Sequence, residues 1–259
     1  MDDARLRREI ERLGPWHLEV PVTPELTTRA WLESSPRAGD APRDEVSFFD
    51  PGPYFRAQLR RIYPAGLEGR SFLDCACNCG AYSFLAKEMG AGTCFGFDVR
   101  DRWIEQARFL KENRTVGPSR DMTFEVLDVY DLPAKHLPRF DIAMFKGIFY
   151  HLPDPVTALK LVADLTTELI VVNTSITKGL PDGLLAVKTE SVEHPMSGVH
   201  GLSWYPTGPK VVGDILKWAG FVEARLVWSL PDTGEPLGRI EILASKVPGL
   251  LDAAGGEAV

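Results

Sequence analysis

Two acidic residues in this chain each end a short apolar run. The first run is Ser71-Phe72-Leu73-Asp74, and the second is Thr93-Cys94-Phe95-Gly96-Phe97-Asp98. Each run predicts a buried parallel strand that presents a carboxylate at its C-terminal end, and the 24 residues between the acids (98 − 74) allow one crossover helix. Ligands of open α/β sheets bind outside the carboxyl ends of the strands, and an acid about 20 residues after the first turn can hold ribose hydroxyls. The sequence therefore predicts a site for a nucleoside-containing cofactor.

The elements that must position these acids alternate regularly along the chain. Short apolar strands separated by helical patterns of ~10–15 residues indicate βαβ units with helices on both faces of the sheet. The expected strands are 71–75, 93–98, 123–128, 141–145, 168–173, 221–228 and 239–245, and the expected helices are 83–89, 102–113, 154–165 and 208–219. The last two strands have only a short Pro- and Gly-rich link, so they are expected to pair antiparallel. The predicted fold class is α/β: a doubly wound, mostly parallel seven-stranded sheet that ends in an antiparallel hairpin.

Four segments make up the predicted organisation. Residues 1–67 form a helical and irregular arm or cap, and residues 68–247 form the cofactor-binding domain. Within that domain the long connection 177–207 is expected to be a loop that covers the substrate, because loops longer than ~12–15 residues are usually functional or disordered. Residues 248–259 are expected to be a flexible tail.

Composition and charge narrow the class of partner. The net charge is −7 with a sequence pI ≈ 5.3, whereas a tight nucleic-acid binder usually carries a basic footprint. A small-molecule substrate is therefore favoured over a nucleic acid. No apolar run approaches the ~20 residues of a membrane span, and the charged N-terminus lacks a signal-peptide core. A cytoplasmic protein with no membrane partner is expected, and the oligomeric state is left open.

The four cysteines, at positions 75, 77, 79 and 94, predict packing rather than a metal site. Alternate residues at a strand end point to opposite faces, and zinc motifs usually space their cysteines by two to four residues and add histidines. We therefore expect small reduced side chains that pack a tight turn, and no metal.

A dinucleotide cofactor fits the first turn poorly. The fingerprint for such cofactors needs several glycines so that the backbone can approach a pyrophosphate. Here the turn from Asp74 to Gly80 has only one glycine and carries an acid. An acid suits the ammonium group of S-adenosylmethionine better.

The ordered set of motifs resembles the class I S-adenosylmethionine-dependent methyltransferases over roughly residues 68–246. The matching segments are Phe72-Leu73-Asp74-x-Ala76-Cys77-Asn78-x-Gly80, Gly96-Phe97-Asp98, Val126-Leu127-Asp128-Val129 and Phe140-Asp141-Ile142-Ala143. Two further segments, Asp74 to Ser83 and Lys146 to Pro155, are similar to a subgroup related to the tRNA uridine-5-oxyacetate-forming carboxymethyltransferases. In those relatives the first turn has a glycine where this chain has Ala76.

The resemblance implies a set of cofactor-binding residues. Asp74 and the turn through Ala76, Cys77, Asn78 and Gly80 would hold the methionine portion, and Asp98 the ribose hydroxyls. Asp128 and Val129 would frame the adenine, and the backbone of Lys146 would contact the cofactor. Val99, next to Asp98, is a further cofactor-binding candidate. A structural alternative stands for the acids, since Asp74 and Asp98 could be helix caps and Asp128 a turn former.

The strongest catalytic candidates follow the fourth strand, beside the expected methyl donor. Methyl transfer mainly requires alignment of the reactants, and a general base is needed only if the acceptor must lose a proton. His151 is the candidate base, and Tyr150 could point its hydroxyl at the methyl group or the substrate. The alternatives are a buried histidine bonded to the backbone and a tyrosine that only packs.

Candidate substrate-binding residues lie in the arm and in the long connection. Aromatic and histidine side chains there could close the cavity from two sides and exclude water; they are Tyr54, His194, His200, Trp204 and Tyr205. Arg239 aligns with a position in the carboxymethyl-transferring relatives that could hold an extra carboxylate, although a surface arginine is the alternative.

Three functions follow from these residues. The leading hypothesis is a methyltransferase that uses S-adenosylmethionine and acts on an O or N atom of a small organic molecule. The second is carboxymethyl transfer from carboxy-S-adenosylmethionine, with a tRNA uridine as a conceivable acceptor. The third is a cofactor-binding scaffold without catalysis.

Overall fold

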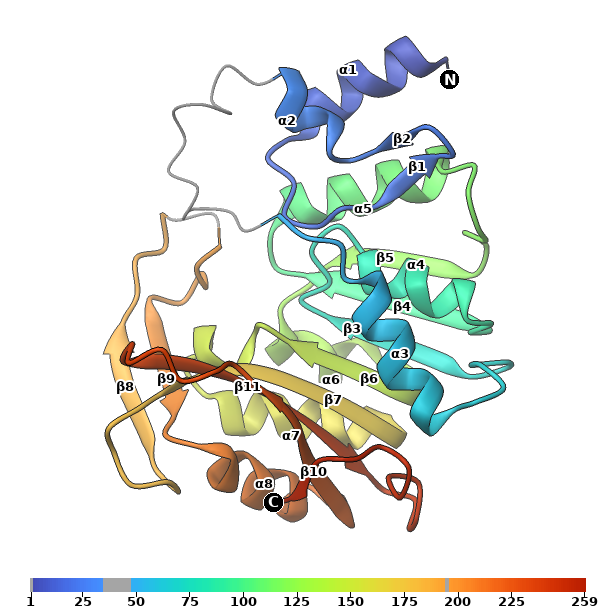
Figure 1. Cartoon of the computed structure of the whole chain (residues 1–259). Coiled ribbons are helices and arrows are strands. Elements are labelled where there is room, and N and C mark those ends of the chain that lie inside the picture. The colour runs from blue at the N-terminus through green and yellow to red at the C-terminus, as the bar shows by residue number, and fades with distance from the viewer. Residues whose placement is uncertain (1, 35–47, 194–195) are drawn as a thin grey trace.

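A central mixed sheet with helices on both faces forms the body of the molecule (Figure 1). The computed structural model describes residues 2–34, 48–193 and 196–259. The sheet has eight strands in the order β12-β10-β11-β7-β6-β3-β4-β5. Its strands are β3 (Ser71–Cys75), β4 (Thr93–Asp98), β5 (Met122–Val126), β6 (Phe140–Lys146), β7 (Thr166–Thr177), β10 (Glu223–Ser229), β11 (Leu237–Ser245) and β12 (Glu257–Ala258).

The predicted fold class is confirmed. Strands β5, β4, β3, β6 and β7 are parallel, and β11 pairs antiparallel with both β7 and β10. The strand order reverses between β3 and β6, which is where the crevice of a doubly wound sheet opens. The seven expected strands are all present, and β12 adds an eighth along the edge of β10.

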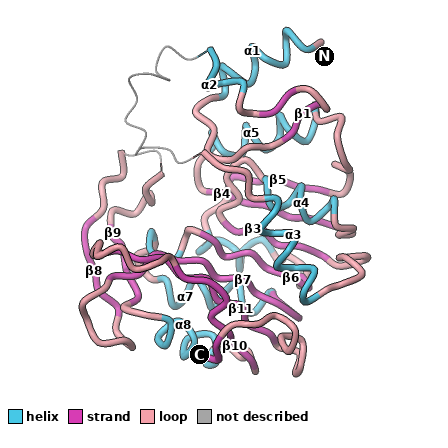
Figure 2. Tube along the Cα trace, viewed as in Figure 1, coloured by secondary structure: helices cyan, strands magenta, loops and turns pink. Residues whose placement is uncertain are grey.

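The helices divide between the two faces of this sheet. On one face lie α3 (Gly52–Ile62), α4 (Ala81–Glu88) and α5 (Asp101–Asn113); on the other lie α6 (Leu132–Lys135), α7 (Pro155–Leu165) and α8 (Pro209–Trp218) (Figure 2). Successive strand residues face opposite sides, so Phe72 belongs to the core under α4 while Leu73 belongs to the core under α7. Two apolar layers therefore hold the strand ends rigidly in register.

The N-terminal arm packs over the first of these layers. It contains α1 (Asp3–Leu13), the hairpin of β1 (Pro21–Thr23) and β2 (Leu26–Thr27), and α2 (Ala30–Ser34). Helix α1 contacts α5 and buries Leu6, Ile10 and Leu13, and Trp16 is fully buried beside Phe109. The arm is thus part of the core of the domain.

Two segments differ from the sequence expectation. The connection 177–207 is not one long loop, because β8 (Leu185–Thr189) and β9 (Leu202–Pro206) pair into a separate antiparallel hairpin that contacts β7. The tail 248–259 is not flexible, because Leu251 is fully buried and β12 extends the sheet. In both segments, short apolar and β-forming stretches within polar sequence were the signal that strands could form there.

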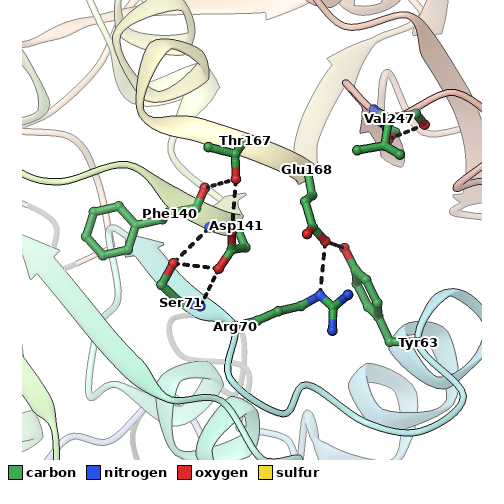
Figure 3. Close-up of polar contacts among 9 residues, drawn as sticks. Tyr63, Arg70, Ser71, Phe140, Asp141, Thr167, Glu168 and Val247 are labelled. Carbon is green, nitrogen blue, oxygen red and sulfur yellow. Dashed lines mark hydrogen bonds and ion pairs between the residues drawn. The ribbon is translucent and has the colours of Figure 1, made fainter.

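Polar contacts join the strands at the edge opposite the crevice (Figure 3). Asp141, at the start of β6, accepts hydrogen bonds from the backbone N (2.8 Å) and Oγ (2.9 Å) of Ser71 and from Oγ1 of Thr167 (3.0 Å). Burial opposes ionisation of this carboxyl, but the Ser71 and Thr167 hydrogen bonds lower its pKa. Glu168 similarly accepts from the hydroxyl of Tyr63 and Nε of Arg70, both at 3.0 Å. Asp141, part of the resemblance, is therefore a structural residue.

Candidate active site

A cavity of about 790 Å³ opens at the carboxyl ends of β3, β4 and β6. Its volume falls within the ~300–1,000 Å³ typical of ligand pockets. Most of the predicted cofactor and catalytic residues line it: Asp74, Ala76, Cys77, Asn78, Asp98, Val99, Asp128, Val129, Lys146, Tyr150 and His151. The predicted substrate residues His200, Tyr205 and Arg239 line it as well. The topology of the sheet therefore brings predicted site residues that are far apart in the sequence, from Asp74 to Arg239, into one cavity.

Asp74 is bonded to the first turn of α4 and also lines the cavity. It lies at the wall of the cavity, and one oxygen, Oδ2, accepts from the backbone N (3.1 Å) and Oγ (2.8 Å) of Ser83 in the first turn of α4. Burial raises its pKa to about 7, against the opposing effect of the Ser83 hydrogen bonds. The other oxygen has no partner among the described residues, so it can accept a hydrogen bond from a ligand.

The turn after β3 depends on left-handed backbone conformations. Ala76 has φ 53° and Asn78 has φ 51°, both in the region that favours glycine. At position 76 the left-handed backbone therefore costs an alanine about 1–2 kcal/mol of conformational free energy. A glycine, as in the resembling subgroup, would avoid this cost. Gly80, at φ 77°, is not among the residues that line the cavity, and a Cβ there would lie 2.6 Å from the ring of Phe124.

Asp98 lies at the end of β4, next to this turn. Its carboxylate accepts the backbone N–H of Asn78 (3.0 Å) and of Arg100 (3.1 Å), so it ties the turn to the start of α5. Burial raises its pKa to about 6, and the backbone hydrogen bonds oppose the rise. Val99, 39% exposed, follows at the rim of the cavity.

Asp128 is a turn former, as one of the alternatives predicted, and it also lines the cavity. Its Oδ1 accepts from the backbone N of Tyr130 (3.1 Å) and so begins the 3-10 helix Val129–Asp131. Its Oδ2 lies 3.0 Å from Nε2 of His200, which comes from the segment after β8. A ligand amine at Asp128 would share this carboxylate with His200.

The side chain of Lys146 is held by a buried carboxylate that sequence reasoning missed. Glu241, in the middle of β11, is 1% exposed and accepts from Nζ of Lys146 at 2.9 Å. It also accepts from the hydroxyl of Tyr54 (2.8 Å), Nε2 of Gln58 (2.6 Å) and Nδ2 of Asn173 (3.0 Å). Burial opposes ionisation of Glu241, but Lys146 and the hydrogen bonds from Gln58 and Tyr54 lower its pKa. The signal in the sequence was a glutamate inside the otherwise apolar run Ile240–Ala244, which indicates a buried carboxylate that needs a partner.

Arg239 places a cation at the wall of the cavity. Its Nε donates to Oδ1 of Asn173 at 2.7 Å, and its Nη2 lies 3.5 Å from the hydroxyl of Tyr150. It forms no ion pair with a carboxylate among the described residues. His17, from the arm, lines the same cavity, and burial together with Arg239 lowers its pKa to about 4. His17 was not among the predicted site residues.

His151 has an acidic partner from the β8–β9 hairpin. It ends the 3-10 helix Phe149–His151, and its Nδ1 lies 2.6 Å from Oε1 of Glu190. Tyr150 packs beside it, with 4.1 Å between the ring centroids, and faces Tyr205 at 5.7 Å. These three predicted residues share the cavity wall, whereas Glu190 had no predicted role.

Two predicted substrate residues lie outside the cavity lining, and a third is not described. The hydroxyl of Tyr54 bonds to Glu241, so its position is indirect. Trp204 donates from Nε1 to the carbonyl of Pro153 at 2.9 Å and fixes the β9 strand there. His194 falls outside the described residues. The arm still contributes to the cavity through His17, Leu18 and Phe49.

The cysteines are buried free thiols. Burial raises the pKa of Cys79 and Cys94 to about 12 and that of Cys75 and Cys77 well above its usual value, so the thiols stay protonated. Within the described ranges, no three His, Cys, Asp or Glu side chains are placed to hold a metal ion. Among those same residues, no helix has the length and apolarity to cross a membrane.

The residues present suit S-adenosylmethionine. Asp74 with its open oxygen can accept from the ammonium group, Asp98 from the ribose hydroxyls and Asp128 from the exocyclic amine of adenine. These three carboxylates line one cavity. A doubly wound sheet with acids of this kind at its switch point defines a class I S-adenosylmethionine-dependent methyltransferase domain.

Comparison with known proteins agrees with this class. A family model described as "Methyltransferase domain" matches residues 67–200, just over half of the chain. The chain belongs to that family, and the predicted enzyme class and cofactor are confirmed.

Curated relatives match over part of their length. The tRNA U34 carboxymethyltransferase of Campylobacter hominis is 37% identical over 94 residues, which are 36% of this chain and 31% of that protein. The match thus spans about a third of the relative. The ubiquinone biosynthesis O-methyltransferase of Neisseria meningitidis is 26% identical over 136 residues, 52% of this chain and 50% of that protein.

A solved structure shares the whole fold. The crystal structure of the N-terminal domain of EvdMO1 with SAH bound superposes with a TM-score of 0.73 at 20% identity, covering 95% of this chain and 97% of that one. At this identity the likeness shows the fold.

Proposed function

We propose that this chain transfers the methyl group of S-adenosylmethionine to an O or N atom of a small organic molecule. The observation that carries the proposal is the single cavity that joins three carboxylates suited to the cofactor to His151 and Tyr150. The relative named as an ubiquinone biosynthesis O-methyltransferase supports an oxygen acceptor. The arm residues His17 and Phe49 and the segment 196–200 enclose the cavity from two sides, which supports a compact substrate.

Each residue then has a defined task. When bound, the cofactor supplies an electrophilic methyl group, whose carbon–sulfur bond breaks with both electrons left on sulfur as the acceptor lone pair bonds to carbon. Asp74, Asp98 and Asp128 bind and orient the cofactor. His151 accepts the proton that the acceptor loses, and Tyr150 aligns the acceptor. Such alignment can supply several kcal/mol of the barrier.

Two measurements test the proposal. Calorimetry should detect binding of S-adenosylmethionine and of S-adenosylhomocysteine; absence of both would reject it. Formation of S-adenosylhomocysteine should then be followed across a panel of small hydroxyl- and amine-bearing acceptors. His151→Ala and Tyr150→Phe should keep the calorimetric affinity and lose turnover, whereas a non-catalytic scaffold would give no turnover with the unaltered chain either.

A second candidate, carboxymethyl transfer, is favoured by one observation. Arg239 reaches the cavity beside Tyr150 with no carboxylate partner among the described residues, so it can pair with a carboxylate of a ligand. The partial likeness to tRNA U34 carboxymethyltransferases agrees with this candidate.

The two donors can be separated by one substitution. Arg239→Met should weaken binding of carboxy-S-adenosylmethionine by tenfold or more and leave S-adenosylmethionine unaffected, because a charge-assisted hydrogen bond contributes about 1.5–3 kcal/mol. Arg225→Met, on β10 and outside the cavity lining, is the control. If the unaltered chain prefers ordinary S-adenosylmethionine and does not bind tRNA, this candidate is rejected.

A further inference from the structure

We propose that Glu190 is a positioning residue for His151, holding the imidazole proton on Nδ1 so that Nε2 carries the lone pair that accepts a proton from the acceptor. The inference rests on the proposed function, because it takes His151 as the base. It adds a residue from the β8–β9 hairpin to the machinery of the site.

The contact between His151 and Glu190 is short and partly buried, and among the described residues His151 contacts no second carboxylate. Nδ1 of His151 and Oε1 of Glu190 lie 2.6 Å apart, and the two side chains are 17% and 12% exposed. The backbone N of Glu190 donates to the carbonyl of Gly201 at 3.0 Å, which fixes the start of this segment. Burial opposes ionisation of Glu190, but the hydrogen bonds from His151 and from the backbone N of Gly198 lower its pKa.

The backbone N–H of Gly198 bears on whether Nδ1 of His151 carries a proton, because it lies near both Glu190 and this nitrogen. Its backbone N lies 3.1 Å from Oε2 of Glu190 and 3.2 Å from Nδ1 of His151. An ionised carboxylate is the stronger acceptor, so this N–H belongs to Glu190 and Nδ1 is left to donate to Oε1. In a neutral imidazole one nitrogen donates and the other accepts, so Nε2 is then the acceptor.

The geometry also requires a glycine at position 198. A Cβ there would lie 2.4 Å from the carbonyl oxygen of His151, 2.9 Å from its Cβ and 3.1 Å from Oε2 of Glu190. The segment therefore approaches His151 as closely as backbone can. Nε2 of His151 has no partner among the described residues, and the side chain lines the cavity.

Glu190 also stabilises the state that forms during transfer. The proton that leaves the acceptor moves to Nε2, and the resulting imidazolium is positive. An ionised carboxylate at 2.6 Å compensates that charge in a partly buried site. A pair that only fastened the hairpin to the core would not need a particular tautomer.

The test is therefore the tautomer of His151, read from its ¹⁵N shifts in selectively labelled protein, with His151→Asn assigning the signal. The unaltered chain should show mainly Nδ1–H. Glu190→Ala should lower the ratio of Nδ1–H to Nε2–H tautomer by at least about tenfold. This is the change expected from the loss of one hydrogen bond to a charged group. Glu190→Leu fills the same space without an acceptor and gives the same answer should the alanine variant unfold. Glu193→Ala, an exposed glutamate nearby, should change nothing.

Nε2–H in the unaltered chain, or Nδ1–H retained in both Glu190 variants, overturns the proposal. Calorimetry with S-adenosylhomocysteine on the same samples tests the proposed function separately. The unaltered chain and the variants should bind it within about twofold of one another. Loss of binding in the unaltered chain would reject the proposed function whatever the tautomer.

Discussion

Affinity for the cofactor should rise steeply between pH 5.5 and pH 7.5. Burial raises the pKa of Asp74 to about 7 and that of Asp98 to about 6, and both must be ionised to accept from the ammonium and ribose hydroxyl groups. Because ligand donors favour the ionised form, binding lowers both pKa values and releases protons, so the dissociation constant falls as the pH rises.

The magnitude follows from the two ionised fractions. Over this range the fraction for Asp74 grows from about 3% to about 76%, a factor of ~25, when its pKa is about 7. For Asp98, with a pKa of about 6, the corresponding growth is from about 24% to about 97%, a factor of ~4. Together the affinity should change by about 100-fold, or ~2.7 kcal/mol.

Calorimetry with S-adenosylhomocysteine in buffers of different ionisation enthalpy measures both quantities. Roughly 1.4 protons should be released per ligand at pH 6. Asp74→Asn should leave only the ~4-fold part of the pH dependence. Asp214→Asn, an exposed acid on α8, should keep all of it. A change of about fourfold or less in the unaltered chain, which Asp98 alone would give, would refute the assignment of Asp74 to the ammonium group.

Three stability predictions test how the site is supported. Ala76→Gly removes a left-handed alanine, so chemical denaturation should show a gain of about 0.5–1 kcal/mol in the free energy of unfolding; a loss would contradict it. Gly80→Ala and Gly69→Ala share a positive φ, but only the first places a Cβ 2.6 Å from Phe124, so it should cost a further ~1–3 kcal/mol, and equal costs would count against the clash. Glu241→Ala removes the buried carboxylate that pairs with the partly exposed ammonium of Lys146 and should cost about 3 kcal/mol in thermal unfolding, the low end for breaking a buried pair; a cost below ~1 kcal/mol would show that the pair contributes little.

The sequence predicts the cofactor half of the cavity better than the acceptor half. Asp74 and Asp98 lie at the C-terminal ends of β3 and β4, and Asp128 comes just after β5, so local pattern and sheet topology suffice to place them. Glu190 reaches His151 across 39 residues, and Glu241 reaches Lys146 across 95. Those contacts depend on how a hairpin and an antiparallel strand dock against the sheet, which no local period encodes.

The errors of interpretation have the same physical origin. Tyr54 and Trp204 were expected in the cavity because aromatic side chains in loops often cover ligands, yet each bonds to a polar group of the core or of a neighbouring loop. Residues 248–259 were expected to be flexible because they lie at the end of the chain. Instead, Leu251 packs into the core on one face of the sheet, and β12 pairs with the edge of β10.

The charges of the cavity divide along the same boundary. The cofactor half carries the carboxylates of Asp74, Asp98 and Asp128, which suit a cationic, donor-rich ligand. The acceptor half carries Arg239 and Lys146, and Glu241 compensates the charge of Lys146 alone. His17 stays neutral between them because burial and Arg239 both oppose its protonation. Among the described residues, Arg239 is therefore a cavity-lining cation without a carboxylate partner, and we expect the molecule that fills that half, donor or acceptor, to bind most tightly when it brings an anionic group to Arg239.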